Sequence, residues 1–264
     1  MAEKIILGLC TSGAWLKIAV LAADNGIKDE LYCPIPFCTG RSPAGGRFFQ
    51  AQKKEFNQER VLFGLVKREL KKAGAELRGV NIVCAARGPG RFTGIRISLT
   101  LAGALKAMSC ARVYTATLFE ILALQASESA HFRAWAGNCG GARLAVLLHA
   151  FRDEYFCQIF HAGGLKIPRP EGDPVWLKAE EMKKLLASLY VIADSQEAAD
   201  VYSLAPANAT RAPAAVSKII PAYIIKAALA YKNKTLKPLY LKPAKYELES
   251  KSPAASRKSH VRKL

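Results

Sequence analysis

The stretch Arg87-Gly-Pro-Gly-Arg-Phe-Thr-Gly-Ile-Arg96 separates two segments of opposite character. Before it, Val80–Ala86 is almost wholly apolar, which predicts a strand buried in the middle of a sheet. After it, Ile95–Ser109 has the length and composition of a helix. The turn between them is rich in glycine, at positions Gly88, Gly90 and Gly94. A strand, a tight turn and a helix in this order predict an α/β protein.

Glycine-rich turns of this kind present backbone N–H groups near a helix N-terminus, which suits an anion. The spacing here is GxGxxxG, which differs from the dinucleotide fingerprint GxGxxG and from the P-loop GxxxxGK[ST]. Two interpretations therefore stay open: a phosphate cradle, or a tight turn without a ligand. The residues of this possible anion site, including the end of the first strand, are Thr11, Ser12, Gly88, Pro89, Gly90, Arg91, Phe92, Thr93, Gly94 and Arg96.

The remaining pattern predicts two βββαβα-like halves. In the first half we expect strands at Lys4–Thr11, Trp15–Ala22 and Leu31–Phe37, a turn at Asp24-Asn25-Gly26, a loop at Thr39–Arg47 and a helix at Ala51–Ala73 that ends before Gly74. On this helix one stripe is formed by Phe56, Phe63, Val66 and Leu70. In the second half we expect strands at Arg112–Thr117, Ala142–Ala150, Glu154–His161 and Leu189–Ala193, with helices at Leu118–Ala126, Lys178–Ser188 and Ser217–Tyr231.

The composition favours a globular protein with an anionic partner. The chain has 264 residues, of which 51% are hydrophobic, and a formal net charge of +18. Such a charge favours partners such as nucleic acid. Residues 232–264 carry ten basic side chains against two acids, and the part after Ser250 has almost nothing to bury, so we expect a disordered basic tail.

Motifs for independent chemistry are absent from the sequence. The seven cysteines form no CxxC pair, and the four histidines form no HExxH motif, so we predict no metal site. No GxSxG nucleophile elbow is present, so we predict no catalytic residue. Arg152 and Glu154 are expected to pair as a structural contact. No apolar run is long enough for a membrane helix or an export signal, so we expect a cytoplasmic chain.

Several short motifs of the sequence together resemble those of the TsaB family (YeaZ-type proteins). Arg87–Arg96 resembles the family signature GRGPGSFTGLR, and Ile6-Leu-Gly-Leu-Cys-Thr-Ser12 resembles its N-terminal ILAIDTS. Asn57-Gln58-Glu59 stands at the family's HSE, and His149-Ala-Phe-Arg-Asp-Glu-Tyr155 stands at its DARRGEVY. Pro238-Leu-Tyr-Leu-Lys-Pro243 is similar to its terminal PLYLRP. The resemblance runs in order from residue 4 to about residue 243.

This resemblance implies an actin-like, sugar-kinase-like (ASKHA) fold of two ribonuclease-H-like lobes. It also implies a non-catalytic subunit that pairs with a TsaD-type catalytic subunit. With a TsaE-type ATPase, that pair transfers threonylcarbamoyl to adenosine 37 of tRNAs that read ANN codons. ATP and Mg²⁺ are then expected on the partner subunits, with no cofactor intrinsic to this chain and tRNA reached through the complex. Alone, the chain is expected to form a homodimer.

The expected organisation is a first lobe over 1–111, which holds the signature turn and the partner-binding helices. A second lobe covers 112–235, with its last helix able to pack back on the first lobe, and a C-terminal segment and tail cover 236–264. The residues that the resemblance suggests for the partner interface are Phe56, Glu59, Phe63, Val66, Ile95 and Leu99.

Departures from the family pattern weaken the case for intrinsic chemistry. Cys10 replaces the acid of DTS, and a neutral thiol cannot hold Mg²⁺. Arg91 replaces a small serine, and His149 replaces the aspartate of DARR. Two other functions stay open: an independent ASKHA-fold ATPase or phosphotransferase that uses the Gly88–Gly94 turn, and a plain RNA-binding module. For the second, no basic face with interleaved aromatics, as such modules show, is apparent in the sequence.

Overall fold

The computed structural model describes residues 3–23, 46–137, 141–164 and 166–242. The turn expected at Asp24-Asn25-Gly26, the strand expected at Leu31–Phe37 and the basic residues after 242 lie outside these ranges, as does nearly all of the expected loop Thr39–Arg47.

The first lobe contains a five-stranded sheet in the order β3-β2-β1-β4-β5. Its strands are β1 (Lys4–Cys10), β2 (Trp15–Ala23), β3 (Arg47–Lys54), β4 (Val80–Ala86) and β5 (Arg112–Ala116). The β2 strand runs antiparallel to both β1 and β3, while β4 runs parallel to β1, and β5 runs parallel to β4. The β1 strand is therefore flanked on both sides, which accounts for its continuous burial.

The second sheet repeats this arrangement. Its order is β11-β10-β6-β7-β8, with β9 also paired to β7. Its strands are β6 (Arg143–Phe151), β7 (Glu154–His161), β8 (Arg169–Pro170), β9 (Val175–Lys178), β10 (Tyr190–Ala193) and β11 (Thr210–Arg211). As in the first lobe, the first strand has an antiparallel hairpin partner on one side and two successive parallel strands on the other. The two predicted halves are thus confirmed as two related sheets.

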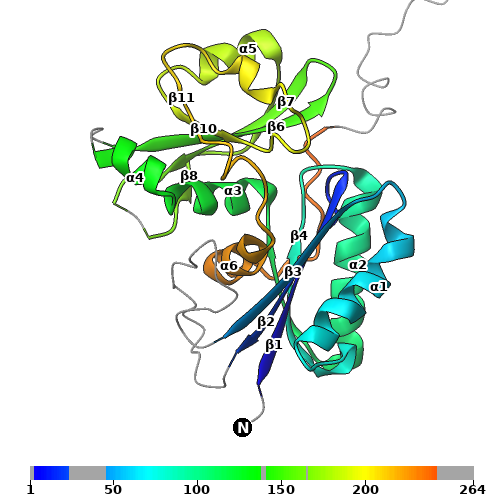
Figure 1. The fold of residues 1–264 in the computed structure, drawn as a ribbon. Helices are drawn as coiled ribbons and strands as arrows, with labels where there is room; N and C mark the ends of the chain where they lie inside the picture. Colours follow the sequence, from blue (N-terminus) through cyan, green and yellow to red (C-terminus); the bar gives the residue numbers. More distant parts are fainter. Residues whose placement is uncertain (1–2, 24–45, 138–140, 165, 243–264) are drawn as a thin grey trace, which may run out of the picture.

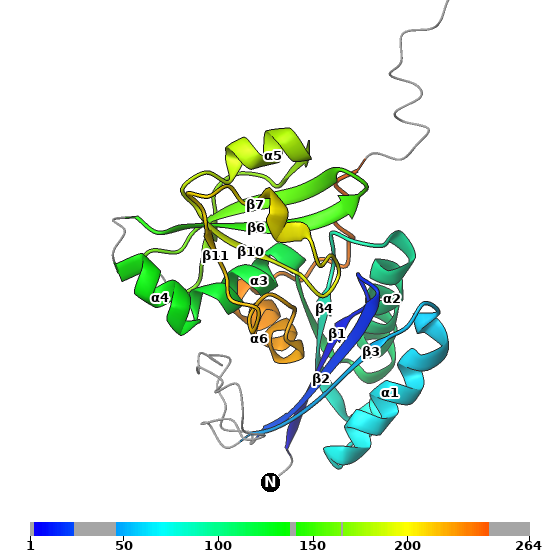
Figure 2. The ribbon, with the colours of Figure 1, turned by 45° about the horizontal axis from the view of Figure 1, so that its top comes forward.

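Helices separate and cover the two sheets (Figure 1). The helices α1 (Gln58–Lys72) and α2 (Phe92–Ser109) pack on one face of the first sheet. The helices α3 (Leu118–Ser127) and α6 (Pro221–Tyr231) lie between the two sheets, as a turned view also shows (Figure 2). The short helices α4 (Ala130–Gly137) and α5 (Ala179–Leu185) belong to the second lobe, and α5 covers the outer face of its sheet.

Alternation along β1 divides the core into two parts. Leu7 and Leu9 point into the cluster under α1 and α2, whereas Ile6 and Cys10 point toward α3 and α6. A Cβ at Gly8 would lie 2.8 Å from the Ile225 side chain, so glycine here lets α6 approach the sheet closely. This helix is what joins the two lobes into one continuous core.

The turn after β4 packs directly on the end of β1. A Cβ at Gly94 would lie 1.9 Å from the backbone oxygen of Thr11, and the Thr11 hydroxyl donates to the Gly94 oxygen over 2.5 Å. At Gly90, where φ is +153°, a Cβ would lie 2.4 Å from the Ser12 oxygen. That oxygen accepts a hydrogen bond from the Arg91 N–H at 2.7 Å. The glycines of the signature are therefore required for this backbone contact.

A buried ion pair joins the first sheet to the second. Lys17 of β2 lies 3.5 Å from the carboxylate of Asp194, which follows β10. Their side chains are 1% and 4% exposed. Burial raises the pKa of Asp194, and the Lys17 charge counteracts this rise.

Several expected elements need correction. Residues 51–54 are not helical: they end the edge strand β3, and the helix begins only at Gln58. The buried stripe of α1 is formed by Leu62, Val66 and Leu70, so Phe63 lies outside it. The helix α4 and the short strands β8, β9 and β11 carry too few residues to give a periodic signal.

The expected lobe boundary at residue 112 falls too early. The β5 strand, Arg112–Ala116, pairs with β4 and completes the first sheet. The helix α6 packs on β1, β4 and β5 of that sheet, although it follows the second lobe in sequence.

We expect opposite effects from alanine at two glycines. Gly94→Ala places its methyl group on a backbone oxygen and should destabilise the protein by about 3 kcal/mol or more. Gly64 lies in α1 with open space around it, so Gly64→Ala should stabilise the protein by about 0.5–1 kcal/mol. Urea denaturation of both variants measures the difference, and equal effects would contradict the close contact.

A second prediction concerns pH and the Lys17–Asp194 pair. Lys17→Met leaves a buried unpaired carboxylate and should cost about 3–5 kcal/mol at neutral pH. Because the pKa of Asp194 then rises further, protonation favours the folded state, and the deficit should shrink as pH falls through that pKa.

The control is the double variant Lys17→Met, Asp194→Asn, which has no carboxylate to titrate at this position. Denaturation between pH 5 and 8 should show a smaller pH dependence for the double variant. A deficit in Lys17→Met that does not change with pH would show that the carboxylate is not confined as described.

Candidate functional site

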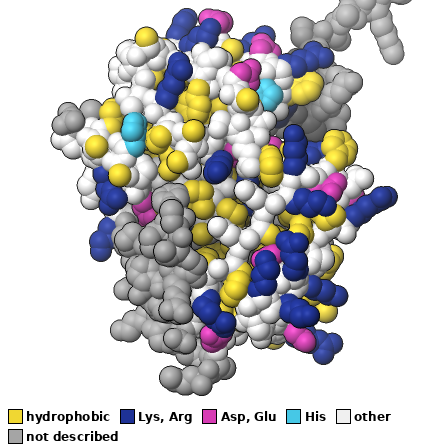
Figure 3. All heavy atoms as spheres, in the orientation of Figure 1, with side chains coloured by type: hydrophobic (Ala, Val, Ile, Leu, Met, Phe, Trp, Pro, Cys, Tyr) yellow, Lys and Arg dark blue, Asp and Glu magenta, His cyan; other side chains and the backbone are white. Residues whose placement is uncertain are grey.

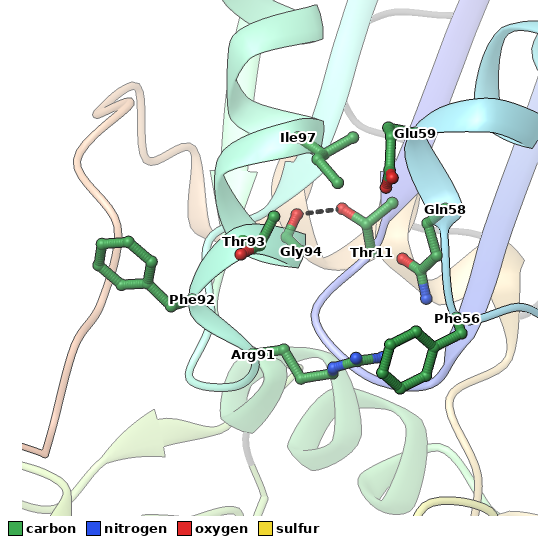
Figure 4. A pocket seen from close by; sticks show the side chains of 9 residues that line it. All are labelled: Thr11, Phe56, Gln58, Glu59, Arg91, Phe92, Thr93, Gly94 and Ile97. Atoms are coloured by element: carbon green, nitrogen blue, oxygen red, sulfur yellow. Dashed lines mark hydrogen bonds between the residues drawn. The ribbon is translucent and has the colours of Figure 1, made fainter.

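A cavity of about 240 Å³ opens where the N-terminal ends of α1 and α2 meet the end of β1. Figure 4 shows around it side chains from the starts of α1 and α2 and that of Thr11, which follows β1. It is lined by Thr11, Phe56, Gln58, Glu59, Arg91, Phe92, Thr93, Gly94 and Ile97. Cavities that enclose small ligands are typically about 300–1,000 Å³, so this one is better suited to a side chain of a partner protein than to a nucleotide.

The rim of the cavity combines an apolar ring and a cation. The Phe56 side chain is 80% exposed, and the Arg91 guanidinium lies 4.8 Å from the centre of its ring. Figure 4 shows these two side chains side by side at the cavity mouth. Phe63, seven residues further along the chain and within α1, is 51% exposed. Phe56 and Phe63 are two of the large hydrophobic side chains that are exposed in the described part of the chain.

Three of the expected interface residues are not on this surface. Val66, Ile95 and Leu99 are buried in the core under α1 and α2, where they hold the helices to the sheet. Because they are buried, these three side chains are not exposed to a partner in this structure, contrary to the expectation. Phe56 and Phe63 are exposed, as is Glu59.

The signature turn contains both buried and accessible residues. Thr11 and Ser12 are fully buried, and the oxygens of Ser12 and Gly94 already accept hydrogen bonds from within this region. Gly88 and Pro89 are buried too. The Gly88 oxygen accepts a hydrogen bond from the N–H of Leu118, the first residue of α3. Close backbone packing alone thus explains Gly88, Gly90 and Gly94, without a bound anion.

The exposed residues of the turn make contacts with the C-terminal segment as well as with the cavity. Phe92 lines the cavity, and its ring extends away from the other labelled side chains (Figure 4) to stack on Tyr240, with ring centres 4.9 Å apart. Arg96 lies 3.7 Å above the Phe92 ring and donates to the Tyr240 hydroxyl at 3.1 Å. Thr93 is exposed and lines the cavity.

A carboxylate of the second lobe occupies the turn between β1 and β2, and sequence reasoning missed it. Glu197 accepts hydrogen bonds from the N–H groups of Ala14, at 2.7 Å, and Trp15, at 3.1 Å. A Cβ at Gly13 would lie 2.2 Å from this carboxylate. Gly13 is the one sequence feature that could have indicated a close contact at this turn. It could not indicate the partner, because Glu197 lies 184 residues further along the chain.

The position of the family's acid holds a neutral group. Cys10 is buried at the end of β1, and burial raises the pKa of its thiol, so it stays protonated at neutral pH. Among the described residues no three His, Cys, Asp or Glu side chains gather as a metal site requires.

The segment at His149 has structural contacts. The His149 ring lies 2.9 Å from the Arg152 oxygen across the β6–β7 turn. Glu154 pairs with Lys242 over 2.5 Å, so the expected pairing with Arg152 gives way to a contact with the C-terminal segment.

None of the helices in the described ranges has both the length and the apolar character needed to span a bilayer. No protein-family model matches the sequence. One curated protein does, the tRNA N6-adenosine threonylcarbamoyltransferase of Encephalitozoon cuniculi, at 31% identity over 101 residues. This match spans 38% of the chain and 28% of that longer protein.

Solved structures match over almost the whole chain. YeaZ from Pseudomonas aeruginosa is similar with a TM-score of 0.60 at 18% identity, over 90% of this chain and all of the other. A crystal structure described as an uncharacterized Pseudomonas aeruginosa protein similar to peptidase YeaZ gives a TM-score of 0.62 with the same identity and coverage. The chain therefore has the two-lobed fold of these YeaZ structures, which is the fold that the resemblance in its sequence implies.

Proposed function

We propose that this chain is a non-catalytic subunit that works with a TsaD-type partner in the transfer of threonylcarbamoyl to adenosine 37 of tRNAs that read ANN codons. A TsaE-type ATPase completes the assembly, which acts in the cytoplasm. ATP and Mg²⁺ belong to the partner subunits.

The observation that carries this proposal is the cavity between the ends of α1 and α2. Its rim presents Phe56 with Arg91 stacked on it, and Phe63 continues the apolar surface along α1. A side chain from another protein can fill the cavity while these rings are covered, which is how hot spots of interfaces are built. In the absence of the partner, the same surface serves a homodimer.

Three further observations support the proposal. The fold is that of the YeaZ proteins across 90% of the chain. Close backbone packing is sufficient to account for glycine at Gly90 and Gly94 of the signature turn. A curated tRNA N6-adenosine threonylcarbamoyltransferase matches over 101 residues, which supports the same reaction.

An independent ATPase or phosphotransferase is the alternative, and the site disfavours it. The two N–H groups of the β1–β2 turn hold the Glu197 carboxylate, which would repel an incoming phosphate. Cys10 supplies no carboxylate for Mg²⁺, which prefers oxygen ligands.

We expect Phe56→Asp and Phe63→Asp to abolish association with a TsaD-type partner. Both rings are exposed, so the monomer stays folded, whereas a carboxylate desolvated in the interface costs several kcal/mol. Co-purification of the two chains measures the loss.

The control is Met108→Asp, because Met108 is 77% exposed at the other end of α2. It should leave association intact. If both phenylalanine variants stay folded and pair normally, the interface lies elsewhere.

The chain alone should not bind Mg-ATP. Isothermal titration of the wild-type chain with ATP and Mg²⁺ should give no saturable heat, since the turn amides are occupied and the acid is absent. Saturable, Mg²⁺-dependent binding would support the phosphotransferase instead.

A further inference from the structure

The segment that follows α6, residues 232–242, ties the two lobes together on the outside. Its backbone bonds to β5 through Thr115 and Asn233, and the Leu239 N–H donates to the Arg87 oxygen at 2.7 Å. At its far end Lys242 pairs with Glu154 of the second lobe. Figure 1 shows this segment (orange) rising from the first lobe to the end of the β6–β7 hairpin.

Exposed aromatic rings line this segment. Phe92 is 53% exposed, Tyr240 is 42% exposed and Phe151 is 56% exposed. Tyr240 stacks on Phe92, while Lys242, two residues further, lies 5.5 Å from the centre of the Phe151 ring. Because two residues span at most about 7 Å, one short stretch of chain connects the rings of both lobes.

Each of these rings has a cation beside it. Arg96 lies over Phe92, and Arg152 lies 5.1 Å from the centre of Phe151 on the side of the β6–β7 turn. The acids at this turn are Asp153 and Glu154, and Glu154 is paired with Lys242. We call the six side chains the aromatic–cation row; they are Phe92, Arg96, Phe151, Arg152, Tyr240 and Lys242.

Rings that alternate with Arg and Lys are the arrangement that single-stranded nucleic acid requires. Bases stack on aromatic faces and on guanidinium planes, while the cations neutralise phosphates. The net charge of +18 gives a long-range attraction to the same polymer. On the face drawn in Figure 3, basic side chains are spread over both lobes and acidic ones are fewer.

We infer that the aromatic–cation row binds unpaired nucleotides of RNA by stacking. The identity of that RNA as tRNA rests on the proposed function, but stacking itself does not. The row adjoins the cavity at α1, because Phe92 also lines that cavity, while the Phe92 ring itself stacks on Tyr240.

The contributions of bases and of phosphates to binding can be measured separately. The probe is a fluorescent single-stranded RNA hexamer, compared with an abasic oligomer of the same length and charge. Basic residues anywhere on the chain bind both probes, so only the preference for the base-bearing probe reports stacking. Fluorescence anisotropy with the full-length chain alone measures both affinities.

The wild type should prefer the base-bearing probe by about 5-fold or more, since one stacked base contributes about 1–3 kcal/mol. Tyr240→Ala and Phe151→Ala should each reduce this preference. The control Phe63→Ala, which removes an exposed ring on another surface, should leave it unchanged. Raising the salt concentration should weaken the binding of both probes alike and leave the preference for the base-bearing probe unchanged.

Three results would overturn the inference. Equal affinity for the two probes would show binding by charge alone. A preference that survives in both alanine variants would place stacking elsewhere. Displacement of the RNA by poly-glutamate as effectively as by unlabelled RNA would show a surface for acidic protein segments. The experiment contains neither a catalytic partner nor threonylcarbamoyl transfer, so its failure leaves the proposed function standing, and the reverse also holds.

Discussion

The contact between the β4–α2 turn and the end of β1 is the constraint on which the rest of the structure depends. No side chain fits at Gly94 or Gly90, because the backbone oxygens of Thr11 and Ser12 occupy that space. The contact fixes the start of α2 and, through the Gly88 oxygen, the start of α3. It therefore positions α2, which covers the first sheet, and α3, which lies between the two sheets.

Much of this could be predicted from the sequence, because the signals are local. A buried apolar run gave β4 with its bounds intact, and the glycines marked the turn. The edge strand β3 escaped, because Gln-Ala-Gln-Lys-Lys reads as helical and only pairing with β2 makes it a strand. The stripe expected on α1 included Phe63, whereas the structure buries Leu62 and leaves Phe63 exposed.

The candidate site was predictable only in part, because burial and contacts between the lobes depend on tertiary structure. The sequence located the turn and the exposed rings Phe56 and Phe63, yet burial removed Val66, Ile95 and Leu99 from the surface. The Glu197 carboxylate on the amides of Ala14 and Trp15 depends on how the lobes meet, which no local pattern encodes. Together with the neutral Cys10, this contact favours a chain that acts by its surfaces. We propose that one surface, at α1 and α2, binds a protein and that another, along the C-terminal segment, binds RNA.

The central claim is that this chain supports a transfer reaction which it does not catalyse. The most direct measurement is threonylcarbamoylation of tRNA in a reconstituted reaction with a TsaD-type partner and a TsaE-type ATPase, with and without this chain. Our account predicts modification only when the chain and the partner are both present. Modification by the chain without the partner, or undiminished modification by the partner without the chain, would contradict it.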